Sequence, residues 1–438
     1  MAGTALSDPM PGALDGVKVL EIAQVMAIPI CGTMLSDMGA DVVKLEPTWG
    51  DASRYTMQPV LPGESKSFAV LNRGKRSVGL DLRNAQTREA LEALVRWADV
   101  VLVSVKNEDL AKYKIGYGEL RPLNPSMIYL EHVPLGHKGE MGGLGGYDIV
   151  SAGIAGLTAL IGKERRGQPI YTQPAITDIG TGYLSAMAVC AALYVRRGNG
   201  EGQRIESSLL ATGMATQMNT AHWFAATDPP LREELATGLA ELRSNGAEYA
   251  DMQRLRERII RRAAYGNIYY RYYKTKDSFI SIGCLSLALQ AKFREAAGIV
   301  DPRQEPEFDM GTPEGFERVK ELVGEVEQLM RTRTTAEWIE LLRGYKIPCG
   351  LVNFPEEAIE DPQVTENDYM IELDHPVLGP YRTFAPPVRM DATPTRAQGP
   401  APPLAHHTAE VLREVGLEDD AVQRLIEDGV AGAQLPDQ

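Results

Sequence analysis

The chain contains 438 residues, of which 44% are hydrophobic and 24% are charged, and these shares are ordinary for a globular protein. At roughly 150 residues per domain, this length predicts two or three domains. The 59 acidic and 45 basic residues give a net charge of -14, which excludes a general attraction to nucleic acid or to anionic membranes. An anionic ligand would therefore need a local basic pocket.

Other sequence features exclude secreted, membrane-spanning and metal-binding classes. The first 12 residues lack the basic and apolar regions of a signal peptide. The longest uncharged run, Ile179 to Val195, is shorter than the about 20 apolar residues that a membrane span requires. Neither CxxC pairs nor histidines at metal spacing accompany the four cysteines, Cys31, Cys190, Cys284 and Cys349. We therefore predict a cytoplasmic protein with reduced cysteines, no metal site and no membrane partner.

Strand-like and helix-like segments alternate along the first third of the chain. Val17 to Ile22 predicts a strand, Pro29 to Met38 a helix and Val42 to Leu45 a second strand, which together form a βαβ unit. The alternation continues with strands at Ser77 to Leu82, Val100 to Val105 and Met127 to Leu130, and with a helix at Ala85 to Trp97. This pattern predicts a parallel sheet covered by helices on both faces.

The middle of the chain predicts a buried helix and then a change of character. A helix from about Ile179 to Arg197 is rich in Gly and Ala, so it can pack close to its neighbours, and a strand follows at Arg204 to Leu209. Residues 229–262 are charged and helical without a strand pattern, which indicates an inserted or connecting element. Tyr269 to Lys276 and Phe279 to Ile282 predict a hairpin in a small domain.

These segments predict an α/β protein with two domains. A large domain with a doubly wound, Rossmann-like parallel sheet is expected at residues 1–225. Linker helices and a small α+β domain are expected at 226–344. Residues 345–438 are expected to return to the large domain and to end in two helices, Thr408 to Val415 and Asp419 to Asp428.

The first strand-to-helix turn points to a ligand pocket without a dinucleotide motif. Ala23 to Pro29 lacks the GxGxxG pattern, which argues against a nicotinamide cofactor. Ligands of doubly wound sheets lie beyond the carboxyl ends of the strands, so Gln24, Val25, Met26 and the loop after Val105 are candidate pocket walls. Simple packing of these residues is an equally open interpretation.

Asp178 is the acidic residue with the clearest chemical setting. It lies in Thr177-Asp178-Ile179-Gly180 at the start of the Gly- and Ala-rich helix, where the helix dipole favours an ionised carboxylate by roughly 0.3 to 1 kcal/mol. Aspartate is also common at such positions as an N-cap or first-turn residue. Position alone therefore leaves a structural and a catalytic role open.

Several motifs in one order resemble family III CoA-transferases, the CaiB/BaiF family. They include Gly146-Tyr147-Asp148, the helix that carries Asp178, and the segment RRGNGEGQRIESSL from Arg196 to Leu209. The likeness covers nearly the whole chain except residues 229–262. Five further segments match: the opening DGVKVLEIAQVMAIPICGTMLSDMGADVVKLE, Lys75 to Ser77, TAEW, IPCG and APPLAHHT. The resemblance implies an interlocked, ring-like homodimer, no permanently bound cofactor, and coenzyme A or acyl-CoA as substrate.

The resemblance also implies roles for individual residues. Asp178 would attack an acyl-CoA thioester, form an acyl anhydride and then an aspartyl-CoA thioester, and finally pass CoA to a free carboxylic acid. With a reference pKa of about 3.9, an aspartate is ionised at neutral pH and needs no general base. Besides Gln24, Val25 and Met26, the residues expected near CoA are Lys75, Arg76, Ser104, Val105, Lys106, Lys112 and Tyr147, and the lysines could equally be solvated surface residues.

Departures from the family pattern bear on the substrate. Met26 stands where formyl-CoA transferase has a glutamine, and the small domain lacks that enzyme's run of glycines, which disfavours oxalate. Four tyrosines could line a larger acyl pocket or pack in a strand core: Tyr269, Tyr270, Tyr272 and Tyr273.

Two alternative functions stay open from the sequence. The superfamily includes α-methylacyl-CoA racemases, which use a histidine and an aspartate as bases, and here Tyr147 occupies the position of that histidine. A phenol with a pKa near 10 is a poor base at neutral pH, although His132 or His137 could substitute for it. A non-catalytic CoA-binding protein is the second alternative.

Overall fold

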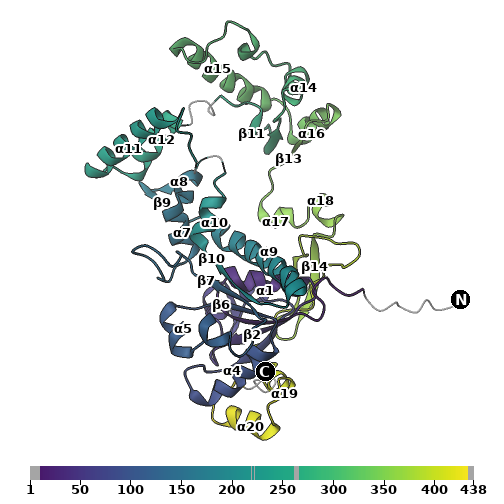
Figure 1. Cartoon of the computed structure of the whole chain (residues 1–438). Helices are drawn as coiled ribbons and strands as arrows, with labels where there is room; N and C mark the ends of the chain where they lie inside the picture. The colour runs from purple at the N-terminus through teal and green to yellow at the C-terminus, as the bar shows by residue number, and fades with distance from the viewer. Residues whose placement is uncertain (1–9, 219, 221, 261–265, 433–438) are drawn as a thin grey trace, which may run out of the picture. The chain divides into compact units, whose positions relative to one another are not determined.

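The computed structural model describes residues 10–218, 220, 222–260 and 266–432. Their contacts form two compact units, shown in Figure 1. The large unit comprises the described parts of 1–163, 169–222 and 365–438, and the small unit comprises 164–168 and the described parts of 223–364. Residues 345–364, which the sequence assigned to the large domain, thus group with the small unit.

Six parallel strands form the central sheet of the large unit, in the order β10-β7-β6-β1-β2-β5. The strands are β1 (Lys18–Ala23), β2 (Asp41–Glu46), β5 (Arg76–Gly79), β6 (Val100–Ser104), β7 (Ile128–His132) and β10 (Gln203–Ser207). The parallel sheet predicted from strand and helix alternation is therefore confirmed. Both faces are covered, which explains why the strands read as nearly continuous apolar runs.

Alternate residues of the strands point to opposite faces of the sheet and pack in two hydrophobic cores. Leu20 and Val101 belong to the core that also contains Leu94, which lies on α4 (Arg88–Trp97). Val19 belongs to the other core with Val189. This second core is covered by α1 (Ala27–Asp37) and α9 (Ile176–Asn199), and α19 (Thr408–Glu414) and α20 (Asp419–Glu427) contribute to the first.

Helix α9 packs tightly along α1, as its small residues predict. A Cβ atom on Gly182 would lie 2.6 Å from the side chain of Ile30, so only glycine fits at this crossing. The helix begins at Ile176, three residues before the predicted start at Ile179. By length and composition α9 could cross a membrane, and 39% of its most apolar window is buried within the chain. Its exposed apolar side chains include Tyr183, Leu184, Met187, Tyr194 and Val195.

Shorter elements complete the large unit. They are α2 (Ser53–Thr56), β3 (Pro59–Leu61), β4 (Glu64–Ser65), α3 (Lys66–Leu71), the 3-10 helix η1 (Ala85–Thr87), α5 (Asn107–Tyr113), α6 (Tyr117–Leu120), α7 (Asp148–Ala155), α8 (Leu157–Ile161) and α10 (Leu209–Ala215), followed by the hairpin of β14 (Met370–His375) and β15 (Gly379–Phe384). β8 (Glu164–Arg165) and β9 (Gln168–Pro169) form a two-stranded ladder at a point where the chain passes between the units.

The small unit combines a helical pair with a three-stranded antiparallel sheet. The charged segment forms α11 (Pro229–Ser244) and α12 (Tyr249–Ile260), and the sheet contains β11 (Tyr270–Lys274), β12 (Phe279–Gly283) and β13 (Cys349–Leu351). The other elements are α14 (Leu287–Ala297), the 3-10 helix η2 (Pro302–Gln304), α15 (Pro313–Met330), α16 (Thr335–Gly344), α17 (Pro355–Ala358) and α18 (Pro362–Thr365). Tyr269 and Tyr273 are buried in its core, whereas Tyr270 and Tyr272 are exposed.

Candidate active site

The turn after β1 adopts an unusual backbone conformation at one wall of the site. Val25 has a φ of 72°, a left-handed value that is rare for a β-branched residue and costs roughly 1–3 kcal/mol. The carboxylate of Asp51 accepts a hydrogen bond from the Val25 N–H, with Oδ1 at 3.1 Å. Helix α1 begins two residues later, so this contact fixes the start of the helix at the sheet edge.

Asp51 belongs to a buried network of ion pairs at the ends of β1 and β2. The Nζ atom of Lys44 lies 2.9 Å from Asp51 and 3.0 Å from Glu21, and all three side chains are fully buried. Although burial alone lowers the pKa of Lys44, the charges of Asp51, Glu21 and Glu46 raise it above the ordinary value. Arg54 pairs with Glu46 at 2.9 Å in the same network. These carboxylates are therefore neutralised by cations that are already inside the protein.

The structure removes two of the predicted CoA-binding cations from consideration. Lys75 is fully buried, and its Nζ donates to Glu21 Oε2 at 2.8 Å and to Asn72 Oδ1 at 2.9 Å. Burial lowers the pKa of Lys75 to about 8. Arg76 forms ion pairs with Asp41 at 2.5 Å and with Glu414 at 2.6 Å. Neither residue lines the two cavities described below, and each pairs with groups on the sheet or its flanking segments.

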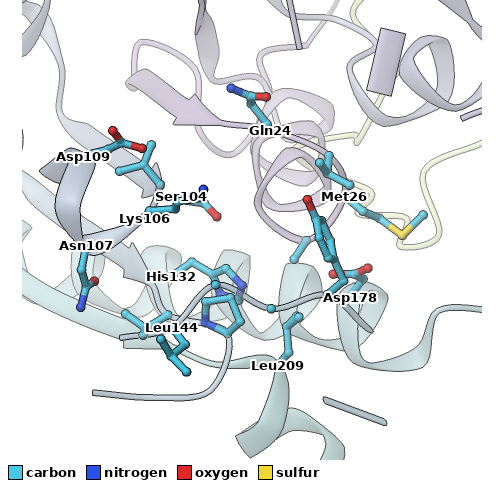
Figure 2. A pocket seen from close by; sticks show the side chains of 18 of the residues that line it. Gln24, Met26, Ser104, Lys106, Asn107, Asp109, His132, Leu144, Asp178 and Leu209 are labelled. Atoms are coloured by element: carbon cyan, nitrogen blue, oxygen red, sulfur yellow. The ribbon is translucent and has the colours of Figure 1, made fainter. Parts of the chain in front are cut away.

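A cavity of about 540 Å³ opens at the carboxyl ends of β1, β6 and β7. It brings together seven of the predicted CoA contacts and the predicted nucleophile: Gln24, Val25, Met26, Ser104, Val105, Lys106, Tyr147 and Asp178. Figure 2 shows Asp178 beside Met26 at one side of the cavity, with Asp109 at the other. The remaining wall residues are Ala27, Ala52, Asn107, Asp109, His132, Val133, Pro134, Gly143, Leu144, Gly145, Gly146 and Leu209.

Asp178 is the third residue of α9 and is held there by a second carboxylate. Asp148, the first residue of α7, is buried, and its Oδ1 atom accepts from Thr177 N at 2.8 Å, from Thr177 Oγ1 at 2.5 Å and from Asp178 N at 3.4 Å. Asp148 thus satisfies N–H groups that the first turn of a helix leaves without an intrahelical partner. The two carboxylates, from α7 and α9, consequently lie close together, and of the two only Asp178 lines this cavity.

This arrangement changes the acidity of Asp178. Burial, followed by the charge of Asp148, raises the pKa of the Asp178 carboxyl group to about 7. Burial and the same carboxylates raise the pKa of Tyr171 to about 12, and its hydroxyl hydrogen bonds to Asp148. The expectation that Asp178 keeps an ordinary aspartate pKa is therefore wrong, since the helix dipole is outweighed by desolvation and by a like charge.

His132 lines the cavity, although the sequence analysis considered it only as a substitute base. It ends β7, is almost fully buried, and its Nδ1 lies 3.1 Å from Ser207 Oγ. Burial lowers the pKa of His132 to about 4, so the imidazole is neutral at physiological pH. His137 instead contacts Glu131 and Arg204 and is absent from the cavity wall.

A second cavity, of about 230 Å³, shares Gln24, Val105 and Asp109 with the first. Its wall includes Trp49 and Arg83, and the Arg83 guanidinium stacks 4.5 Å from the Trp49 ring centre. Lys112 lines neither cavity but is exposed beside Tyr113, which lines the second. No cluster of three or more His, Cys, Asp or Glu side chains that could hold a metal occurs in the part of the chain that the structure describes.

Two important site residues were missed because their partners are distant in the sequence. Asp148 follows Tyr147 in a motif used only for the family resemblance, yet it contacts residues 29 and 30 positions later. Asp51 precedes Ser53, whose N–H and hydroxyl both donate to it at 2.8 Å, a local pattern that signals an ordered turn. The sequence could therefore have predicted an ordered turn at Asp51, but it could not have predicted the contact of Asp51 with Val25.

Comparison with known proteins identifies the family. The model of CoA-transferase family III matches residues 14–408. This chain belongs to CoA-transferase family III. A succinate–glutarate CoA-transferase from Agrobacterium fabrum is 33% identical over 418 residues, which cover 92% of this chain and 95% of the relative. A formyl-CoA:oxalate CoA-transferase from Rhodopseudomonas palustris is 29% identical and covers 96% of this chain and 97% of its own length.

A solved structure agrees with this family III assignment. A CaiB/BaiF family protein from Brucella suis superposes with a TM-score of 0.71 at 26% identity, covering 92% of this chain and 100% of that chain. The predicted family and enzyme class are confirmed, and the protein is a CoA-transferase whose substrates are CoA thioesters. The parallel six-stranded sheet also agrees with the CaiB/BaiF structure.

Proposed function

We propose that this CoA-transferase moves CoA from an acyl-CoA donor to a free carboxylic acid through covalent intermediates on Asp178. The observation that carries the proposal is the position of Asp178, in the first turn of α9 and in the wall of a cavity at the carboxyl ends of three parallel strands. Ligands of doubly wound sheets bind at this edge. A carboxylate that faces such a cavity is accessible to a thioester.

The chemistry requires an oxygen nucleophile and a site for the tetrahedral oxyanion. An Asp178 oxygen attacks the thioester carbon, and the carbon–sulfur bond breaks with its electron pair on CoA, which leaves as a thiolate. The thiolate attacks the Asp178 carbonyl of the anhydride and releases the donor acid. The acceptor carboxylate then repeats both steps in reverse. The N-terminal turn of α1, which starts at Ala27 in the cavity wall, offers N–H groups to the oxyanion.

CoA has phosphate groups at one end and a thiol at the other, so it needs an elongated site. The two cavities meet at Gln24 and Val105, which supports a bound CoA with its thioester near Asp178 and its nucleotide toward the second cavity. Among the described residues, Lys106 lines the first cavity and Arg83 the second, and Lys112 lies beside Tyr113 of the second cavity. These three replace Lys75 and Arg76 as candidate phosphate partners.

The exposed apolar side of α9 supports a homodimer. Met187 and Tyr194 are 63% and 82% exposed, and Ile149 and Ile154 are exposed on α7. Exposed apolar side chains on two helices that contact each other are typical of a protein interface. We propose that a second copy of the chain covers these side chains, in the interlocked arrangement that the family resemblance implies. Size-exclusion chromatography with light scattering tests this, and a monomer at micromolar concentration would contradict it.

The donor and acceptor acids are proposed from the relatives. The Agrobacterium relative is named for succinate and glutarate, and Met26 lines the cavity where formyl-CoA transferase has a glutamine. We propose succinyl-CoA as donor and a saturated dicarboxylic acid of similar length as acceptor. A panel of acyl-CoA donors and free acids, read by mass spectrometry, tests this; preference for oxalate over every longer acid would contradict it.

His132 makes the racemase alternative testable, because a neutral imidazole can act as a base beside a carboxylate. The same assay run in deuterated water with an α-methylacyl-CoA separates the two reactions. A CoA-transferase forms new acyl-CoA without deuterium at the α-carbon, and a racemase incorporates deuterium without any acceptor acid. If neither product forms with any donor, a non-catalytic CoA-binding role follows.

A further inference from the structure

The Asp148 carboxylate is built into the start of α9 and has no place in the catalytic steps above. Its Oδ1 atom accepts from the N–H and the hydroxyl of Thr177 and more weakly from Asp178 N. The side chain is buried, and Tyr171 hydrogen bonds to it from the segment before α9. Because Asp148 is buried, does not line the cavity and uses Oδ1 to hold the first turn of α9, it is not a second nucleophile.

The other groups around Asp178 do not offset the charge of Asp148. Helices α1 and α10 also pack against α9, but α10 (LLATGMA) has no ionisable side chain and α1 begins with Ala27-Ile28-Pro29. Tyr171 is neutral, because burial raises its pKa to about 12, and His132 is neutral at physiological pH. Tyr147 also lines the cavity, and Lys106 and Asp109 lie across it from Asp178 (Figure 2). In the described part of the chain, Asp148 is the charged group that acts most strongly on Asp178.

We propose that Asp148 is a positioning residue for Asp178: it fixes the first turn of α9 and, by its own negative charge, keeps the neighbouring carboxylate reactive. This inference rests on the proposed nucleophilic role of Asp178. Like charges at close range destabilise each other when both are ionised. When an Asp178 oxygen bonds to the acyl carbon and CoA departs as thiolate, Asp178 loses its charge and the repulsion ends. The charge of Asp148 therefore favours anhydride formation over the resting carboxylate.

The substitution Asp148→Asn separates charge from geometry. Asparagine keeps an Oδ1 acceptor for Thr177 and is nearly as good as aspartate at helix N-termini, so α9 retains its start. The charge is lost, and the titration midpoint of Asp178 falls by about one pH unit or more. It is measured by NMR on protein with ¹³C-labelled aspartate, and the Asp178 signal is identified by its absence from Asp178→Asn. Glu108→Gln, an exposed charge removal on α5, leaves the midpoint unchanged.

Transfer kinetics distinguish a charge effect from a structural one. In Asp148→Asn we expect kcat/KM to fall by up to about tenfold at pH 8 and by much less at pH 6. At pH 6 the variant has a larger ionised share of Asp178 than the wild type, and this offsets part of the loss. A merely structural role lowers the rate by the same factor at every pH. Asp148→Ala, which removes both the charge and the acceptor, is expected to be slower than Asp148→Asn at all pH values.

The outcomes separate this inference from the proposed function. An unchanged Asp178 midpoint in Asp148→Asn, or a pH-independent loss of rate, overturns the role of Asp148 while Asp178 stays the nucleophile. If the wild-type enzyme transfers CoA but forms no covalent adduct on Asp178, the proposed function fails, whatever the NMR titration gives. If Asp148→Asn is unstable, the same titration is run on Tyr171→Phe, which keeps the charge of Asp148 and its contacts with Thr177. The Asp178 midpoint is then expected to stay near that of the wild type. A fall in Tyr171→Phe equal to that expected for Asp148→Asn overturns the role of the charge.

Discussion

Two groups of buried or partly buried carboxylates in the large unit have opposite surroundings. At the ends of β1 and β2, Glu21, Glu46 and Asp51 lie against Lys44, Lys75 and Arg54 at 2.8 to 3.0 Å. At the junction of α7 and α9, Asp148 and Asp178 lie against each other, and neither forms an ion pair in the described part of the chain. The first group is neutralised internally, and the second is not.

The difference shows how one sheet edge supports both structure and chemistry. Against burial, which raises it, Lys44 and the Ser53 N–H hold the pKa of Asp51 below its usual range, so this carboxylate stays ionised and positions the Val25 turn. Burial and Asp148 raise the pKa of Asp178 to about 7, which leaves a more basic oxygen at the cavity. A carboxylate paired with a cation stays ionised and has a structural role, whereas a carboxylate beside a second carboxylate has a raised pKa and is a candidate nucleophile.

Removing the reactive carboxylate gives the largest expected effect. Asp178→Ala is predicted to lower CoA transfer by at least about a thousandfold, because Asp109, another carboxylate in the described cavity wall, lies at the other side of the cavity (Figure 2). Folding is expected to persist, which circular dichroism and light scattering check. Substantial transfer by this variant would assign the covalent chemistry to another residue.

Removing a supporting cation affects stability before activity. Lys44→Met leaves Asp51 and Glu21 buried with one partner fewer, and we expect a loss of about 3–5 kcal/mol in the free energy of unfolding. Urea denaturation measures the change. Lys138→Met, on an exposed loop, serves as the matched control and is expected to stay within about 0.5 kcal/mol of the wild type. Equal stability of both variants would show that the network is dispensable.

The pH dependence of turnover reports the ionisation of Asp178 beside Asp148. With the pKa of Asp178 at about 7, kcat/KM is predicted to rise about tenfold per pH unit below pH 6 and to level off above pH 8. The rise follows the ionised fraction of the nucleophile. Initial rates between pH 5 and 9, with a donor that does not titrate in this range, measure it. A flat profile from pH 5 upward would indicate an Asp178 of ordinary acidity.

The smallest predicted effect is on thermal stability. Because the folded-state pKa of Asp178 lies above its unfolded value, the folded protein binds this proton more tightly, and stability is lost as pH rises from about 4 to about 7. Asp178→Asn is uncharged throughout and is therefore predicted to raise the melting temperature by about 2 °C or more at pH 8, with little change at pH 4. Calorimetry at both pH values gives the comparison, and a shift of equal size at both would contradict the like-charge interpretation.

The fold could be predicted from the sequence because its signals are local. Alternating apolar segments fix the parallel sheet, and the glycines of α9 signal its close approach to α1. The pocket walls at Gln24 to Met26 followed from the rule that ligands lie beyond strand ends. These residues needed no knowledge of distant partners.

The electrostatics of the site could not be predicted in this way. Lys75 resembles a surface lysine in sequence, and only folding places Glu21, 54 positions earlier, against its ammonium group. The Asp148 contact spans 29 residues, so the raised pKa of Asp178 has no local signature. The division at residues 364 and 365 was likewise missed, because β13 pairs with β12 across almost 70 residues of chain.

Oxygen exchange into Asp178 tests the central claim most directly. Each turnover leaves one acceptor oxygen on the nucleophile, so an acceptor acid labelled with ¹⁸O in both carboxylate positions should make the peptide that contains Asp178 heavier by one ¹⁸O and, over several turnovers, by two. Peptide mass spectrometry after digestion reads this out, with Asp178→Asn and a reaction lacking the donor as controls. Formation of the new acyl-CoA without ¹⁸O in that peptide would contradict a covalent role for Asp178.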